Sequence, residues 1–85
     1  MTIYEFERLG DTGKGQAILK SGVLLAERFC MDLRVALYQI EGFYVEVYFN
    51  STYKVIQGLK SFIDSDSLDP YLEQIDISEL LYTEL

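Results

Sequence analysis

Apolar and polar residues alternate most clearly in the middle of the chain. Residues 34–50 read RVALYQIEGFYVEVYFN, which is two alternating runs joined at Glu41-Gly42. A period of two predicts β-strands, and a short glycine-containing link between two such runs predicts an antiparallel hairpin. We therefore expect strands at residues 34–39 and 43–49.

One further strand is predicted on each side of this hairpin. Residues 23–31 (VLLAERFCM) are apolar and compatible with a strand, and Asp32-Leu33 is the expected turn after them. Residues 54–63 (KVIQGLKSFI) follow a polar loop, and Gly58 inside them suggests a β-bulge. Strands at this close spacing favour a four-stranded antiparallel meander.

The residues before the strands predict a short helix. Asp11 or Thr12 can cap a helix that runs to about Ser21, and Gly22 stands where a C′ glycine is common. Residues 2–8 alternate imperfectly between aromatic and acidic side chains, which predicts a short edge strand or an extended arm.

A second helix is expected after the strands. Residues 64–70 (DSDSLDP) form a loop, with Asp69 at the N-cap and Pro70 at the first helical position. Asp76 and Glu79 have the spacing of a capping box for a last turn. The side chains expected to face the sheet are Tyr71, Leu72 and Ile75. The predicted fold class is α+β: one domain, residues 1–85, with a four-stranded antiparallel β-meander flanked by a short N-terminal helix and a C-terminal helix.

Two registers compete in the central hairpin. A two-residue loop pairs Ile40 with Phe43, but it requires positive φ at Glu41, which glutamate resists. A three-residue loop pairs Gln39 with Phe43 and places Gly42 in the left-handed bulge position. We favour the three-residue loop because its turn chemistry fits better and because it separates aliphatic from phenolic side chains.

This register assigns the hairpin side chains to two faces. One face holds Val35, Leu37, Phe43, Val45, Val47 and Phe49. The other holds Ala36, Tyr38, Tyr44, Glu46 and Tyr48.

The tyrosine-bearing face has three possible roles. It can be covered by another element of the same subunit, or it can line a small-molecule pocket, or it can bind another protein. We expect the last, with a homo-oligomer as its simplest form: Tyr38, Tyr44 and Tyr48 would make the contact, and Glu46 would select the partner by charge. A small-molecule site would instead lie between the sheet and the C-terminal helix, lined by Phe43, Val45 and Leu72.

The charge of the chain argues against polyanionic partners. Its 85 residues carry 14 acidic and 7 basic side chains, a formal charge of −7, and the basic residues are scattered singly. Nucleic acids and anionic membranes both require clustered Lys and Arg, so we expect neither as a partner. An acidic inhibitor or decoy that binds a basic protein is a further alternative.

The chain offers little equipment for catalysis. It has no histidine, and its single cysteine, Cys30, has no obvious activating neighbour and excludes an internal disulfide. Residues 10–15 (GDTGKG) lack the spacing of a phosphate-binding loop, and the acidic residues of 64–69 miss the EF-hand pattern. We expect a non-enzymatic cytoplasmic protein with no catalytic residue, cofactor or metal, and without a signal peptide or a membrane-spanning segment.

Two segments carry a resemblance to other sequences: EGFYVEV (residues 41–47) and PYLEQIDISEL (residues 70–80). With GVLLAERF before them, the chain resembles a family of short, uncharacterised bacterial proteins of about this length, over residues 2–81. The chain departs from that pattern in DTGKGQ (residues 11–16), where relatives would carry a more acidic, better helix-forming stretch. The resemblance implies no activity, cofactor or site residue.

Overall fold

The computed structural model describes residues 1–71, and these form one antiparallel sheet with helices on both sides. The order of elements is α1 (Ile3–Glu7), α2 (Asp11–Ser21), β1 (Val23–Cys30), β2 (Leu33–Ile40), β3 (Phe43–Asn50), β4 (Val55–Phe62) and the 3-10 helix η1 (Ser65–Tyr71). The spatial order of the strands is β1-β2-β3-β4. The predicted α+β class, the four-stranded meander and the N-terminal helix are therefore confirmed, whereas the predicted helix beyond Tyr71 lies outside the described residues.

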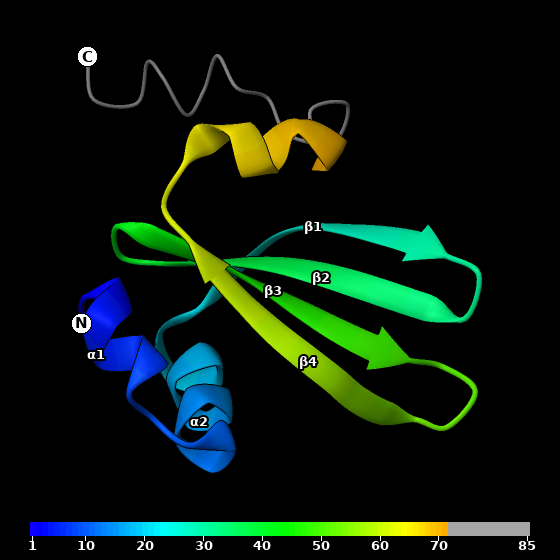
Figure 1. Cartoon of the computed structure of the whole chain (residues 1–85), viewed down its shortest axis with the longest axis horizontal. Helices are drawn as coiled ribbons and strands as arrows, with labels where there is room; N and C mark the ends of the chain where they lie inside the picture. Colours follow the sequence, from blue (N-terminus) through cyan, green and yellow to red (C-terminus); the bar gives the residue numbers. More distant parts are fainter. Residues whose placement is uncertain (72–85) are drawn as a thin grey trace.

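Helices cover the two faces of the sheet unequally (Figure 1). Helices α1 and α2 lie on one face, which we call the helix face, and η1 lies on the other, which we call the η1 face. The β1–β2 and β3–β4 turns lie at the end of the sheet away from the β2–β3 turn, and they extend beyond α1 and α2. The core is correspondingly in two parts. On the helix face it contains Phe6, Ile18, Ile40, Phe43 and Val45, and on the η1 face it contains Ala26, Leu37, Phe62, Leu68 and Tyr71.

The predicted register of the central hairpin is wrong. Ile40 pairs with Phe43 across a two-residue loop, and Glu41 adopts a φ of 50° while no glycine among the described residues has positive φ. A three-residue loop would leave Ile40 in the turn, whereas here Ile40 and Phe43 are both buried. Full burial of two large apolar side chains contributes about 1.5–3 kcal/mol each, which exceeds the roughly 1–2 kcal/mol that a left-handed non-glycine residue costs.

The register change redistributes the hairpin side chains. Val45 and Val47 lie on the helix face with Tyr38, whereas Tyr44 and Tyr48 lie on the η1 face. The predicted separation of aliphatic from phenolic side chains is therefore wrong too: each face carries both kinds.

The N-terminal arm is a helix and not the expected edge strand. The Thr2 hydroxyl accepts a hydrogen bond from the Glu5 backbone N–H (3.2 Å), and the Glu5 carboxylate accepts one from the Thr2 N–H (2.8 Å). This capping box outweighs the imperfect alternation of the segment. It turns Phe6 into the core, where its ring lies 5.4 Å from that of Phe43.

Helix α2 ends at Ser21 as predicted, but the capping residues at its two ends act differently from the prediction. Gly10 is the N-cap, so Asp11 is already helical and gives no side-chain cap. Gly22 follows the last helical residue in extended backbone, and a Cβ there would lie 2.5 Å from the Ile18 carbonyl oxygen. Glycine is therefore required at position 22 because a side chain would clash with this carbonyl oxygen, and not because the backbone is left-handed there.

The remaining turns depart only slightly from expectation. The β1–β2 turn is Met31-Asp32, one residue earlier than predicted. The predicted bulge is confirmed beside Gly58, where Gln57 is the extra residue of β4. The predicted loop at residues 64–70 is wrong, because Ser65–Tyr71 form η1 and Asp69 and Pro70 lie within it instead of at the start of a helix. Asp64 stabilises this earlier start by accepting hydrogen bonds from the Ser67 N–H and hydroxyl.

Candidate protein-interaction surface

The predicted contact residues do not form one surface. Tyr38 lies on the helix face, while Tyr44, Glu46 and Tyr48 lie on the η1 face. Tyr44 is partly buried and stacks on Phe62, with ring centroids 5.5 Å apart. Only Tyr38 therefore adjoins the exposed surface described below.

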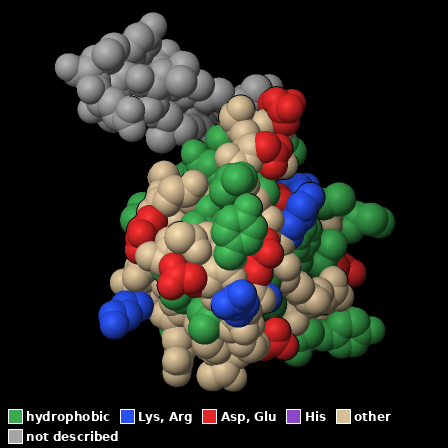
Figure 2. Space-filling model, turned by 60° about the vertical axis from the view of Figure 1, so that its left-hand side comes forward, with side chains coloured by type: hydrophobic (Ala, Val, Ile, Leu, Met, Phe, Trp, Pro, Cys, Tyr) green, Lys and Arg blue, Asp and Glu red, His purple; other side chains and the backbone are tan. Residues whose placement is uncertain are grey.

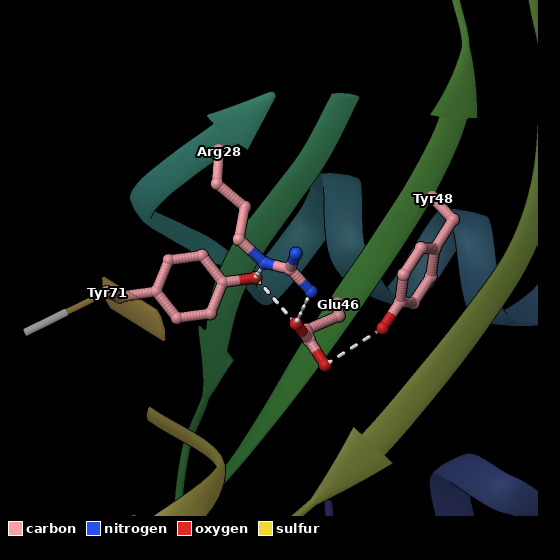
Figure 3. A network of polar contacts seen from close by, with 4 residues as sticks. All are labelled: Arg28, Glu46, Tyr48 and Tyr71. Carbon is pink, nitrogen blue, oxygen red and sulfur yellow. Dashed lines mark hydrogen bonds and ion pairs between the residues drawn. The ribbon is translucent and has the colours of Figure 1, made fainter. Parts of the chain in front are cut away.

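Glu46 is buried within a polar network on the η1 face (Figure 3). Only 4% of the residue is exposed. One carboxylate oxygen accepts a hydrogen bond from the Tyr71 hydroxyl (2.6 Å) and a longer one from Arg28 (3.5 Å), and the other accepts one from the Tyr48 hydroxyl (3.2 Å). Since Glu46 is enclosed by its own subunit, it does not present a free charge to a partner.

This network joins η1 to the sheet. Tyr71 is fully buried, and Arg28 from β1 both donates to its hydroxyl (3.3 Å) and stacks over its ring. Burial and the hydrogen bond to Glu46 raise the pKa of the Tyr71 hydroxyl far above the ordinary tyrosine value. Burial and the same carboxylate also raise the pKa of Tyr48. Both hydroxyls thus stay protonated and keep donating, which makes the network an anchor for η1.

The helices of residues 1–71 cover the helix face over only half its length. Helices α1 and α2 pack on the half nearest the Glu41-Gly42 turn. Beyond them, Phe29, Arg34, Phe49 and Ile56 form a row across all four strands, because each is the pairing partner of the next. Phe29 is 73% exposed and Ile56 is 61% exposed. We call this region the open half-face; its members are Phe29, Arg34, Ala36, Val47, Phe49 and Ile56.

A groove connects the open half-face with α2. A cavity of about 490 Å³ lies between one side of α2 and strands β3 and β4, and a second of about 230 Å³ lies over the open half-face. Both are lined by Tyr38, Val47 and Ile56, so they adjoin each other. Of the residues predicted to line a small-molecule cavity, Phe43 and Val45 are packed in the core of the helix face, and Leu72 lies outside the described residues.

More apolar side chains surround the far ends of the hairpins. Met31 in the β1–β2 turn is 99% exposed, and Tyr53 in the β3–β4 loop is 74% exposed. The two turns are held together because the Ser51 N–H and hydroxyl both donate to the Asp32 carbonyl at 2.8 Å. Figure 2 shows several hydrophobic side chains projecting from the body of the protein. Clustered exposed apolar side chains of this kind mark interaction surfaces.

The sheet edges are less suited to pairing than the open half-face. Strands β1 and β4 are the two edges, and each carries a bulge, at Leu25 and Gln57. Bulges at edges interrupt the ladder that another strand would need. Association through the face is therefore favoured over extension of the sheet.

The other candidate motifs have structural roles or remain unassigned. The residues of the glycine-rich segment lie within α2 and its N-cap, and Asp64 caps η1. Cys30 is free and exposed at the end of β1. Within residues 1–71, no group of three or more His, Cys, Asp or Glu side chains could hold a metal ion, and no helix is long and apolar enough to cross a bilayer.

No family model, curated protein or solved structure matches this chain. The resemblance of residues 41–47 and 70–80 to a family of short bacterial proteins therefore stays a prediction. Function has to be argued from the surface itself.

Proposed function

We propose that this protein is a non-enzymatic protein-interaction module whose docking surface is the open half-face. One observation carries the proposal: Phe29, Phe49 and Ile56 lie in one cross-strand row that no helix of the described chain covers. Aromatic and aliphatic side chains around an arginine are typical of the centres of protein interfaces. This surface replaces the tyrosine face predicted from the sequence and retains Tyr38 at its border.

Cross-linking with a matched pair of variants tests this function. Ile56→Ser removes an apolar side chain from the open half-face, and Ile63→Ser removes an equally exposed one (61% and 60%) directly after the other end of β4. We expect cross-linked species, of the purified protein or in extract of its native cell, to be lost with Ile56→Ser and kept with Ile63→Ser. The proposal would be contradicted if the wild type gave no cross-linked species, or if both substitutions reduced those species equally.

A second candidate is the binding of a small apolar ligand in the groove beside α2. Its volume of about 490 Å³ lies in the range of ligand sites, and Tyr38, Lys14 and Gln57 offer polar groups around an apolar lining. The fluorescent probe 8-anilinonaphthalene-1-sulfonate tests it. We expect saturable one-to-one binding that is lost when Gly15→Leu fills the groove, whereas binding unchanged by this substitution would exclude the groove as the site.

A further inference from the structure

On the helix face, α1 and α2 form a layer of helices that covers only one half of the sheet in residues 1–71. Helix α2 occupies the space above one half of the sheet, and no element of residues 1–71 occupies that space above the open half-face. A helix with its side chains is about 10–12 Å across, and two stacked sheets lie about 10 Å apart. A second sheet would therefore fit beside α2, in the same layer.

We infer that the occupant is a second copy of this chain, packed open half-face against open half-face with its strands running in the opposite direction. This inference rests on the proposed function and names its partner. The sheet of each copy then covers the open half-face of the other. The contact is two-fold symmetric, as in most homodimers.

The position of α2 selects the opposite strand direction. If the two copies had their α2 ends together, the helices would meet and hold the open half-faces apart by more than one layer. Rotation about an axis across the strands removes this collision. It also brings the hairpin ends of each copy, with exposed Met31 and Tyr53, to the α2 of the other.

One glycine supports this arrangement at the groove beside α2. Gly15 lies inside a helix, an element that glycine weakens. It does not have positive φ, and a Cβ there would meet no atom of residues 1–71 within 4 Å, so these residues give no reason for a glycine. Gly15 lines the groove, and close approach of Tyr53 from the second copy explains its small side chain. Gly58 has a different role, because it lies beside the β4 bulge and pairs with Tyr48 on the η1 face.

The charges of the open half-face suit contact with an identical surface. Arg34 and Glu27 form an ion pair at 3.2 Å on this side of the sheet, so the surface is close to neutral although the chain has a charge of −7. In an antiparallel stack, Arg34 of each copy can exchange its partner for Glu27 of the other. A strongly basic partner would instead require uncompensated carboxylates here.

Sedimentation equilibrium of purified variants tests the contact. We expect Ile56→Ser to weaken dimerisation at least about tenfold and Tyr53→Ser about fivefold or more, as for apolar interface residues, with Ile63→Ser unchanged. Arg34→Glu should weaken the dimer, and adding Glu27→Arg should restore it. A wild type that stays monomeric, or a dimer indifferent to Ile56→Ser, would overturn the inference, and indifference to Tyr53→Ser would overturn the opposite strand direction.

Lysine cross-linking of the wild type requires no variant to fold. In the inferred dimer, Lys54 in the β3–β4 loop of one copy lies near Lys14 on α2 of the other. A mixture of isotopically labelled and unlabelled protein should give Lys54–Lys14 links between copies. Links between copies that join Lys14 to Lys14 would place the two α2 ends together and contradict the arrangement.

The two proposals fail separately. Suppose that a cross-linked species is sensitive to Ile56→Ser but has a mass other than twice that of the chain. The open half-face would then be a docking surface for another protein, and only the second copy would be wrong.

Discussion

At Glu46, burial reverses the role that the sequence suggests for a charged residue among tyrosines. In the alternating pattern, Glu46 stands between Tyr44 and Tyr48 and resembles a charge displayed on a phenolic surface. In the structure, two tyrosine hydroxyls and an arginine enclose it. The sequence could not predict this, because Tyr71 comes from an element 25 residues away and the faces depended on a turn of uncertain length.

Removing the Tyr71 hydroxyl should destabilise the protein. Tyr71→Phe keeps the ring but leaves one oxygen of buried Glu46 with only the 3.5 Å contact from Arg28. Hydrogen bonds to charged groups contribute about 1.5–3 kcal/mol, and we expect a loss of that size in urea unfolding. Tyr4→Phe, at a side chain that is largely exposed, should change little. Equal stability of Tyr71→Phe and the wild type would show that the network does not anchor η1.

The raised pKa of Tyr71 predicts a loss of stability at alkaline pH. The folded state keeps the Tyr71 proton above pH 10, where an ordinary tyrosine of the unfolded chain loses it. The unfolded state then binds fewer protons, so the free energy of unfolding falls as pH rises beyond about 10. Tyr48 acts in the same direction. Urea unfolding between about pH 8 and 11 should show this fall, and Tyr71→Phe should reduce its slope. An unchanged slope would contradict the assignment.

Individual elements show which sequence signals were strong. The strands and α2 follow from periodicity and glycine positions, and they appear within one or two residues of the predicted ends. The prediction of an extended N-terminal arm was wrong because two aromatic residues suggested a strand-like alternation. Thr2 and Glu5 form a capping box, and their spacing could have been recognised in the sequence. The predicted hairpin register was wrong because it was chosen from the local turn chemistry alone. The burial of Ile40, which favours the observed register, depends on the packing of α1 and α2 on the sheet.

Gly15 gives a test at the level of one helix. An added methyl group meets no atom of residues 1–71 within 4 Å, so Gly15→Ala should stabilise the monomer by about 0.5–1 kcal/mol through helix propensity. The same methyl group enters the groove beside α2 and should weaken self-association. Urea unfolding at low protein concentration and sedimentation at high concentration measure the two effects. Lower monomer stability would mean that the fold itself requires Gly15.

At the scale of the whole molecule, residues 1–71 leave the open half-face uncovered, and the chain carries a formal charge of −7. The open half-face could not be predicted from the sequence, since its row depends on the pairing of four strands and the predicted register of the central hairpin was wrong. Its apolar centre favours association, whereas the charge of −7 on each copy opposes it.

These two effects predict an unusual response to salt. The Debye length falls from about 10 Å at 0.1 M salt to about 3 Å at 1 M, which screens the repulsion between copies and leaves apolar contact intact. The dimer dissociation constant should therefore decrease as salt rises from about 0.05 to 0.5 M. An acidic decoy for a basic protein would respond in the opposite way, with binding that weakens over the same range.

Contacts between copies test the open half-face most directly. In an equal mixture of isotopically labelled and unlabelled protein, isotope-filtered NMR detects nuclear Overhauser effects that cross the interface alone. We predict such effects between the Ile56 methyl groups of one copy and the Phe49 ring of the other, because rotation about an axis across the strands stacks β4 near β3 and β4 of the partner. Intermolecular effects confined to Tyr44 and Tyr48 on the η1 face would contradict the account, as would their absence at concentrations where the protein sediments as a dimer.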